Sequence, residues 1–465
     1  ASLVAAFCSL AAADAPVGWR MDGSGRYPHA DPPTEWAADK NVVWKTPMPS
    51  WSNSTPVLAG GRLFVGAEPT WLLCVDAADG TILWQKDHSY EQVLTPEEAA
   101  QAKADAAKAE EILAQSRPLH NEMGKCNREL RDLNNKKKDE KDPQALKALE
   151  DQIAKLQGRV AELKVEIGRL DRELAKYSRY RMPPTHDANG YSSCTPASDG
   201  RSVFALFGNG VAACYDLAGE RRWIRLVEKP RQGYGHSASP VLVAGKLVLH
   251  IENTVYGLDP ADGKELWKAG APHAWGTCIA AKAAAADVVV TASGTVLRVE
   301  DGQVLAQGLT RLEYNSPIVH DGTAYFIQNL GKAVRLPAEA AGKAAPEVLW
   351  TTAPSKDRYY SSPLLHDGLI YAIQQKGVLS VIDPGDGKVV REETLKLGAT
   401  VYASVTLAGG YVYVSGEGGV TIVLRPGRDF AEVAVNRLEP FRSSPVFAGS
   451  RMYVRAMKHL WCIGK

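Results

Sequence analysis

The segment VYGLDPADGKELW, residues 255–267, contains the pattern that decides the fold class. An alternating apolar stretch ends at Asp259, a turn follows up to Gly263, and a second short apolar stretch ends at Trp267. This pattern is typical of two β-strands joined by a tight turn. Related stretches are LLCVDAADG from Leu72 and LSVIDPGDG from Leu379. A terminal Trp recurs in the same place, at Trp84, Trp223 and Trp350.

A second phrase precedes each of these strand pairs. It combines Ser, Thr or Asn with a Pro and apolar residues, followed by a turn and an alternating strand. The copies are NSTPVL at Asn53, SCTPAS at Ser193, SASPVL at Ser237, NSPIV at Asn315, SSPLL at Ser361 and SSPVF at Ser443, with weaker copies GTCIAA at Gly276 and ASVTL at Ala403. Four short strands per repeat of about 40 residues is the signature of a propeller blade. The sequence therefore predicts a mostly β fold: an eight-bladed β-propeller of four-stranded antiparallel blades.

The last copy ends before its fourth strand. After SSPVF, the chain has sequence for only two more strands before Lys465. The N-terminal segment NVVWKTP has a Trp, Trp44, where a fourth strand would have one. We expect Val42 to Lys45 to complete the eighth blade, because a ring closed by both ends of the chain leaves no exposed sheet edge at the join.

Residues 95–178 have a helical period. Thr95, Pro96 and Glu98 form a capping box, and apolar residues from Ala109 to Leu133 follow at spacings of three and four. Asp142-Pro143 starts a second helix with a heptad pattern from Leu146 to Leu174. The pattern predicts an inserted antiparallel α-helical coiled-coil hairpin, joined by a polar connection at 136–141. Pro118 is expected to kink or interrupt the first helix.

These patterns divide the chain into four parts. We expect a signal-peptide remnant at 1–15, the closing strand and first blade at 16–92, the helical hairpin at 93–187 and seven blades at 188–465.

Residues 1–13 form an apolar run with small residues at its end, as a secretory signal has, so a periplasmic or secreted location is expected. Lys plus Arg number 54 and Asp plus Glu 53, which indicates no nucleic-acid partner. No stretch predicts a transmembrane segment.

The repeat resembles that of a known family. VYGLDPADGKELW is similar to the pyrroloquinoline-quinone (PQQ) repeat of quinoprotein dehydrogenases, also found in BamB-type outer-membrane assembly proteins. The resemblance covers about residues 17–90 and 190–465 and implies the propeller fold. Enzymes of this family use PQQ with a calcium ion held by Glu, Asn and Asp, often beside a vicinal disulfide. The sequence has no vicinal cysteines, and beyond Glu313 and Asn315 no third calcium ligand is evident.

Candidate ligand residues gather just before the first strand of each blade. The aromatic ones are Trp51, Tyr191, Tyr234, Trp275, Tyr314, Tyr360, Tyr402 and Phe441, and the polar ones are Asn53, His236, Asn315, Arg358 and Arg442. Such residues would form an aromatic-rimmed funnel for a planar cofactor, a sugar or an extended peptide. The alternative is that the aromatic rings only fill gaps between blades. No catalytic residue and no metal ligand is predicted.

The recurring tryptophans are expected to be structural. Trp44, Trp84, Trp223, Trp267 and Trp350 should dock between neighbouring blades. The leading functional hypothesis is a non-catalytic extracytoplasmic scaffold that binds an envelope or extracellular protein, with residues 95–178 as an interaction element. No cofactor is expected. The alternatives are a PQQ- and calcium-dependent dehydrogenase and a propeller that binds a small ligand or sugar. A hairpin that is only a solvated decoration also remains open.

Overall fold

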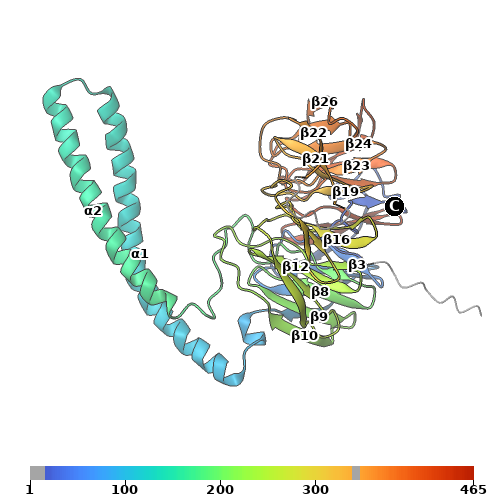
Figure 1. Ribbon diagram of the computed structural model, residues 1–465, viewed down its shortest axis with the longest axis horizontal. Helices are drawn as coiled ribbons and strands as arrows, with labels where there is room; N and C mark the ends of the chain where they lie inside the picture. The colour runs from blue at the N-terminus through green and yellow to red at the C-terminus, as the bar shows by residue number, and fades with distance from the viewer. Residues whose placement is uncertain (1–15, 338–345) are drawn as a thin grey trace, which may run out of the picture. The chain divides into compact units, whose positions relative to one another are not determined.

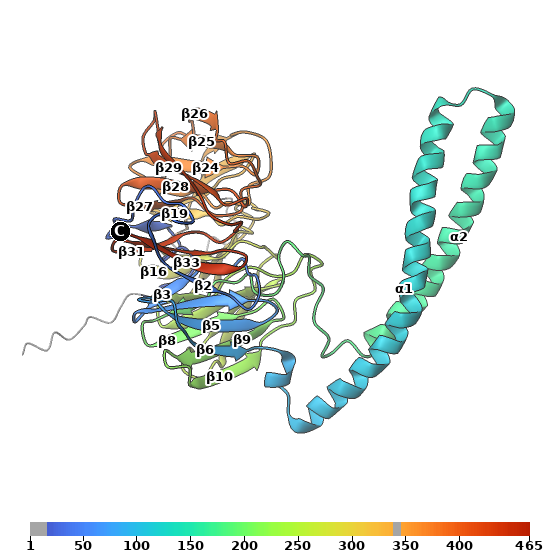
Figure 2. The same ribbon diagram turned by 180° about the vertical axis from the view of Figure 1, so that it is seen from behind.

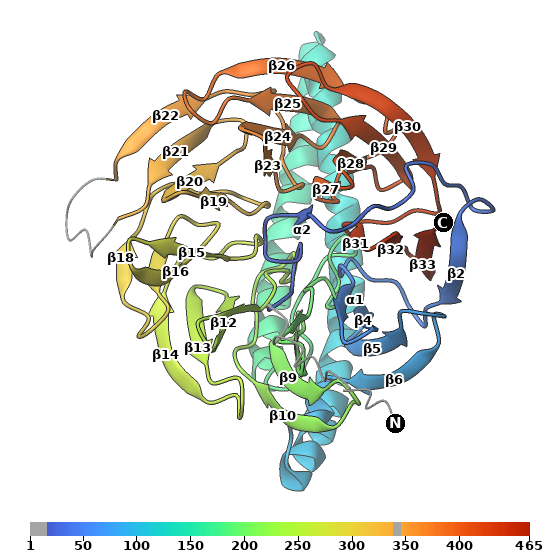
Figure 3. The same cartoon turned by 90° about the vertical axis from the view of Figure 1, so that its right-hand side faces the viewer.

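The computed structural model describes residues 16–337 and 346–465. Within them, eight antiparallel sheets follow one another around a ring (Figure 3), and each contains the four strands of one blade. The prediction of an eight-bladed propeller is confirmed. The predicted signal remnant falls on residues 1–15, outside the described residues. The chain divides into two compact units: the propeller, with the segments up to Gln92 and from Pro183 onward, and Val93–Met182.

The strands of blades 1 to 4 follow in chain order. Blade 1 has β3 (Val57–Ala59), β4 (Arg62–Ala67), β5 (Trp71–Asp76) and β6 (Ile82–Asp87), and a short η1 (Tyr90–Gln92) follows it. Blade 2 has β7 (Ala197–Ser198), β8 (Ser202–Leu206), β9 (Val211–Asp216) and β10 (Arg221–Leu226). Blade 3 has β11 (Val241–Val243), β12 (Lys246–Ile251), β13 (Thr254–Leu258) and β14 (Glu265–Gly270). Blade 4 has β15 (Ile279–Ala283), β16 (Ala286–Val290), β17 (Val296–Arg298) and β18 (Val304–Ala306).

Blades 5 to 8 complete the ring. Blade 5 has β19 (Ile318–His320), β20 (Thr323–Phe326), β21 (Gly331–Arg335) and β22 (Val348–Thr352). Blade 6 has β23 (Leu364–His366), β24 (Leu369–Ile373), β25 (Val378–Ile382) and β26 (Val389–Thr394). Blade 7 has β27 (Thr406–Ala408), β28 (Tyr411–Ser415), β29 (Val420–Arg425) and β30 (Ala431–Arg437), and a short β1 (Arg26–Tyr27) adds to it in parallel. Blade 8 has β31 (Val446–Ala448), β32 (Arg451–Arg455) and β33 (His459–Gly464).

The fourth strand of blade 8 comes from the N-terminal part of the chain. Strand β2 (Val42–Pro47) pairs antiparallel with β33 (Figure 2). In this pairing Trp44 lies opposite Cys462. The predicted ring closure is confirmed. The apolar core lies between blades: Leu63 and Val65 of blade 1 pack with Leu460 and Cys462 of blade 8.

Each of the recurring tryptophans reaches the next blade. Its indole Nε1 donates to a backbone carbonyl that follows the third strand of that blade. The pairs are Trp44 to Ala77 (3.2 Å), Trp84 to Leu217 (3.1 Å), Trp223 to Pro260 (2.8 Å), Trp267 to Val299 (2.9 Å) and Trp350 to Pro384 (2.8 Å). The accepting turn also contains a glycine with positive φ that lies against the indole, such as Gly302 beside Trp267. The Asp-to-Gly turn is therefore the socket into which the preceding blade places its Trp.

The N-terminal segment, residues 16–25, crosses the centre of the ring (Figure 3). Val17 bridges to Ser198 of blade 2, and the amide of Leu407 in blade 7 donates to Gly25. The buried guanidinium of Arg20 donates to the carbonyls of Pro363 (2.9 Å) and Val405 (2.7 Å). These contacts tie blades 2, 6 and 7 together.

The second unit is a helical hairpin. Helix α1 (Pro96–Asp139) starts at the predicted capping box of Thr95 and Glu98, and α2 (Pro143–Ala175) starts at Asp142 (Figure 1). The helices run antiparallel, since Arg159 bonds Glu122 (2.7 Å) and Lys137 pairs with Glu150 (2.8 Å). The connection is shorter than predicted because α1 continues to Asp139. No helix among the described residues is long and apolar enough to span a membrane.

Of the kink or interruption expected at Pro118, the interruption does not occur, because α1 continues past it, and the kink stays a prediction. Proline has no N–H to donate to the carbonyl of Ala114, which costs about 3 kcal/mol in a helix interior. Buried Ile112 and Cys126 lie on either side of Pro118 along α1, and Cys126 packs against Val160 and Leu163 of α2. This packing holds the helix together where propensity would end it.

Replacing Pro118 with Ala should therefore stabilise the hairpin, by about 1–3 kcal/mol, because it restores the missing hydrogen bond. Amide hydrogen exchange of α1 in the full-length protein measures this as slower exchange around residue 118. Pro143→Ala is the matched control, since Pro143 is the first residue of α2, where proline is well tolerated. Equal protection in Pro118→Ala and the unchanged protein would contradict the account.

Candidate functional site: a hydroxyl-lined cup at the channel mouth

A ring of eight hydroxyl side chains surrounds the channel, one from each blade. They belong to the residue just before the Pro, or its replacement, of each repeated phrase: Thr55, Thr195, Ser239, Thr277, Ser316, Ser362, Ser404 and Ser444. Six of the eight following residues are Pro. A residue before Pro is held in extended conformation. Pro has no N–H to donate, and at the start of an edge strand no neighbouring strand needs that donor. The phrase thus fixes one hydroxyl per blade at the channel wall.

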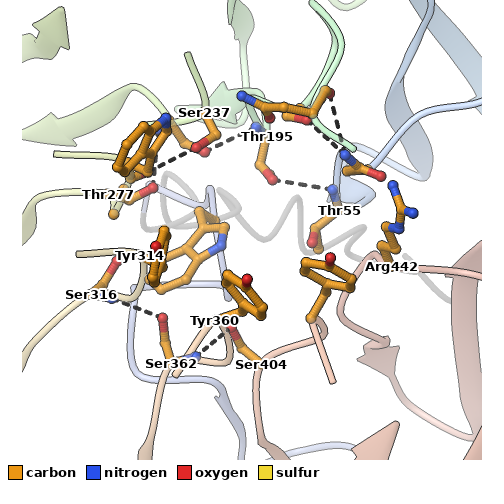
Figure 4. Close-up of a pocket in the computed structure, with 18 of the residues that line it drawn as sticks. Thr55, Thr195, Ser237, Thr277, Tyr314, Ser316, Tyr360, Ser362, Ser404 and Arg442 are labelled. Atoms are coloured by element: carbon orange, nitrogen blue, oxygen red, sulfur yellow. Dashed lines mark hydrogen bonds between the residues drawn. The ribbon is translucent and has the colours of Figure 1, made fainter. Parts of the chain in front are cut away.

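The hydroxyls link neighbouring blades. In seven of eight junctions, the backbone N–H of one ring residue donates to the hydroxyl of the next, at 2.9–3.2 Å (Figure 4). The junction from Thr277 to Ser316 has no such bond, and the hydroxyl of Ser316 is buried without a partner. Gly276 lies against the carbonyl of Asn315 there, at a separation that leaves no space for a Cβ. Blades 4 and 5 therefore approach each other through their backbones.

The hydrogen bonds of the hydroxyl ring lead to a prediction that compares two variants. Ser362→Ala should destabilise the protein by about 1–3 kcal/mol, because it leaves the buried N–H of Ser316 without an acceptor. Ser316→Ala should change the free energy of unfolding by much less, since that hydroxyl accepts no bond. Urea denaturation of both variants measures the difference. Equal losses in the two variants would show that the ring does not carry this bond.

Five aromatic rings form an arc above the hydroxyl ring, on blades 3 to 7. Neighbouring ring centroids lie at 6.4 Å for Tyr234–Trp275, 5.6 Å for Trp275–Tyr314, 4.8 Å for Tyr314–Tyr360 and 4.8 Å for Tyr360–Tyr402. The indole of Trp275 is held by a hydrogen bond to the carbonyl of Gly235 (3.0 Å). Partial burial raises the pKa of Tyr314 and Tyr402, so both phenols stay neutral at physiological pH.

The remaining part of the wall is polar. Arg442 of blade 8 stacks on Tyr402 at 5.0 Å, pairs with Glu417 (2.9 Å) and donates to the carbonyl of Ala188 (3.0 Å). Asn53 donates to the same carbonyl (2.9 Å). The segment 186–189 is fixed on its other side by Asn189, which bonds the carbonyl of Tyr234 (2.9 Å). This segment replaces the aromatic wall on blades 1 and 2.

Ring, arc and polar wall enclose a cup of about 540 Å³, which Trp19 of the N-terminal segment also lines. Volumes of 300–1,000 Å³ are usual for small-molecule sites. Among the described residues, the side chains that line the cup include Arg358, Arg442 and His186 but no carboxylate and no thiol. The cup can therefore donate and accept hydrogen bonds, stack on a ring and attract an anion.

The structure brings eight of the thirteen candidate funnel residues together. Asn53, Tyr234, Trp275, Tyr314, Arg358, Tyr360, Tyr402 and Arg442 line the cup. The other five lie elsewhere. His236 is buried and bonds the carbonyl of Ala238 (3.1 Å), Asn315 is buried and donates to Ile327 (2.9 Å), and Phe441 is buried in the core with Trp461. Trp51 packs on Gly190, and the hydroxyl of Tyr191 donates to Pro183 (2.7 Å).

Sequence reasoning missed the hydroxyl ring of the cup, and it also missed Trp19 and the segment 186–189. The ring hydroxyls are inside the repeated phrase, so their recurrence was a usable signal. Trp19 and the segment 186–189 occur once each, and no period marks them.

A family model described as outer membrane protein assembly factor BamB (PQQ_2) matches residues 34–122 and 251–463, well over half of the chain. The chain belongs to this BamB-type PQQ-repeat family. A comparison with curated proteins finds no match. The membership agrees with the resemblance drawn from the repeat.

Solved structures of this type share the fold. A europium-containing methanol dehydrogenase has a TM-score of 0.54 and 11 % identity, with 94 % of this chain and 89 % of that chain covered. Quinohemoprotein alcohol dehydrogenase from Comamonas testosteroni has a TM-score of 0.50 and 9 % identity, with 97 % and 81 % covered. BamB from Moraxella catarrhalis has a TM-score of 0.45 and 14 % identity, with 57 % and 80 % covered. At such identities the likeness to the two dehydrogenases shows the fold alone.

The residues of the cup do not fit a calcium-bound quinone. Ca²⁺ takes six to eight oxygen ligands, with carboxylates prominent among them, and no carboxylate among the described residues lines the cup. Glu417 is paired with Arg442, and Asn315, a possible ligand by sequence, is buried outside the cup. The described residues also contain no group of three or more His, Cys, Asp or Glu placed to hold a metal ion.

Proposed function

We propose that this chain is a non-catalytic binding propeller that works outside the cytoplasm. In this proposal, the cup holds a small polar ligand and the helical hairpin binds an envelope or extracellular protein. The observation that carries it is the composition of the cup: hydroxyls, aromatic rings and arginines, with no carboxylate or thiol side chain among the described lining residues. Such a wall binds and orients a ligand. Its one imidazole, that of His186, already accepts a hydrogen bond from the amide of Ala188 (3.0 Å), and no carboxylate or thiol among the described lining residues stands beside it.

The cysteines and the most buried histidines also support a non-catalytic cup. The described cysteines are buried and unpaired, and burial raises the pKa of Cys74, Cys214, Cys278 and Cys462 to about 12, which keeps these thiols protonated and inert. The most buried histidines, His88, His236 and His250, lie outside the cup. The apolar run at residues 1–13 and the BamB-type family support the extracytoplasmic location.

The enzyme alternative is tested by adding PQQ and Ca²⁺ to the purified full-length protein. Absorbance, melting temperature and reduction of an artificial electron acceptor in the presence of alcohols are followed together. We expect no alcohol-dependent dye reduction. Dye reduction that needs PQQ and disappears in Trp275→Ala would replace the binding proposal with the dehydrogenase.

The hairpin is tested with a photo-crosslinking residue in place of Val165 in cells. Val165 is the most exposed large apolar side chain on the hairpin, at 74 %. Leu266, exposed at 51 % on outer strand β14, is the matched control position. We expect a defined protein adduct from position 165 and none from position 266. Adducts from both positions or from neither would count against the hairpin as the partner site.

A further inference from the structure

The two sides of the cup differ in chemistry. Five aromatic rings from neighbouring blades form an arc in which two pairs are stacked and the two contacts between and beside them are edge to face: Tyr234, Trp275, Tyr314, Tyr360 and Tyr402. Asn53, Arg442 and segment 186–189 supply the polar sector, with the hydroxyl ring below (Figure 4). A ligand that fills this cup must therefore have one apolar face and many hydrogen-bonding groups around its edge.

We propose that the cup binds a carbohydrate that carries a carboxylate, namely the end of a uronic-acid oligosaccharide. The inference rests on the proposed binding function and adds the chemical class of the ligand. A pyranose ring has a C–H face that packs on an aromatic ring, whose face carries partial negative charge. Its hydroxyls point outward, where amides, guanidinium groups and hydroxyls bind them.

The position of Trp275 supports stacking. Its ring lies almost parallel to that of Tyr314, with an interplanar angle of 23°, and its Nε1 is already used by Gly235. The indole is therefore oriented before any ligand arrives, which lowers the entropy lost on binding. Tyr360 and Tyr402 form a second parallel pair at 23°.

Arg358 is the residue expected to favour a sugar with a carboxylate over a neutral sugar. Its side chain is exposed, donates to the hydroxyl of Tyr360 (3.3 Å) and makes no salt bridge with a described residue. Arg442, in contrast, is paired with Glu417. The hydrogen bond to Tyr360 and the nearby charge of Glu313 raise the pKa of Arg358, but Glu313 forms no salt bridge with it and no described carboxylate lines the cup. A carboxylate on the ligand can therefore bind the Arg358 guanidinium through two parallel hydrogen bonds.

The volume argues for an oligosaccharide end rather than a single small anion. The cup holds about 540 Å³ and opens at the lip formed by Tyr234, which is 63 % exposed. A sulfate or acetate would meet Arg358 but leave the aromatic arc in water. A chain of sugars can cover the arc and leave through the opening.

Isothermal titration of the full-length protein with tri-galacturonate, and with galactotriose as its neutral counterpart, tests the proposal. We expect tri-galacturonate to bind at least tenfold more tightly. Arg358→Gln should remove this preference, because charged hydrogen bonds contribute more than neutral ones. Arg425→Gln, an exposed arginine outside the cup, is the matched control and should leave both affinities unchanged. Trp275→Ala should weaken both sugars at least tenfold, with folding checked by circular dichroism.

Several results would overturn the inference. No heat with either sugar would exclude carbohydrate as the ligand class. Equal affinities for both sugars would exclude the acidic preference, and tri-galacturonate binding unchanged in Trp275→Ala would place the sugar outside the cup. None of these results bears on the dye-reduction and crosslinking readouts, so failure of the ligand class is distinguishable from failure of the proposed function.

Discussion

Lowering the pH from 7 to 5 should reduce the free energy of unfolding by several kcal/mol, because buried histidines are held neutral in the fold. Burial lowers the pKa of His88 and His250 to about 4 and that of His236 to about 3. After burial, charge on His250 and His273 further lowers the pKa of His236, and charge on His273 further lowers that of His250, because protonated neighbours would repel. Neither ring nitrogen of His250 has a hydrogen-bond partner.

The sign follows from where the protons bind. The unfolded chain takes up protons as the pH falls through about 6.5, the ordinary pKa of His, while the folded chain does not until about pH 4. The stability is therefore fully present above pH 6.5 and is lost between 6.5 and 4. Each histidine contributes on the order of 1–2 kcal/mol to the change between pH 7 and pH 5. Most carboxylates titrate below about pH 5, so they contribute little to the change between pH 7 and pH 5.

Urea denaturation between pH 7 and pH 5 measures this loss. His250→Leu is the informative variant, because it replaces a buried imidazole without partners by an apolar side chain of similar size. We expect it to be no less stable than the unchanged protein at pH 7 and clearly more stable at pH 5. His320→Leu, at an exposed turn, is the control and should leave the pH dependence intact. A stability that is flat across the window would contradict the account.

Trp267→Ala should destabilise the propeller by about 3–5 kcal/mol, the usual cost of removing a buried Trp. The indole lies between blades 3 and 4, packs with Val248 and Leu297, and donates to Val299 at 2.9 Å. Its loss leaves both a cavity and a carbonyl without its donor. Guanidinium denaturation at neutral pH gives the value.

A double-mutant cycle with Gly302→Ala tests the socket. A Cβ at Gly302 would lie 2.6 Å from the Trp267 ring, and its φ of +74° adds backbone strain for any other residue. Gly302→Ala should therefore be strongly destabilising in the unchanged protein and less so in Trp267→Ala, where the ring no longer obstructs the methyl group. Additive losses would show that the two residues do not form one contact.

The repeated features of the fold could be predicted from the sequence because each motif recurs in several blades. The phrase ending in Ser-Pro or Thr-Pro marks the inner strand of six blades, and the Asp-to-Gly turn marks the junction of the outer two strands where it occurs. The orphan Trp44 was sufficient to predict ring closure, since only one blade lacked a fourth strand. The helix continues past Pro118 because the local cost of the proline is offset by packing against α2, which no local rule includes.

The candidate site could be predicted only in part. The position two residues before each ring hydroxyl faces the cup, as Tyr402 does before Ser404 and Arg442 does before Ser444. Phe441 lies one residue earlier than that position in blade 8, so it turns into the core. Trp19 and segment 186–189 come from parts of the chain outside the repeat, and their place depends on tertiary contacts such as that of Arg20 with Pro363.

A crystal structure of the full-length protein with tri-galacturonate tests the central claim, that the cup is a ligand-binding site, most directly. The account predicts electron density for sugar rings against Trp275 and Tyr360, with a carboxylate on Arg358. Sugar density found only outside the cup, or an empty cup at saturating ligand, would contradict it.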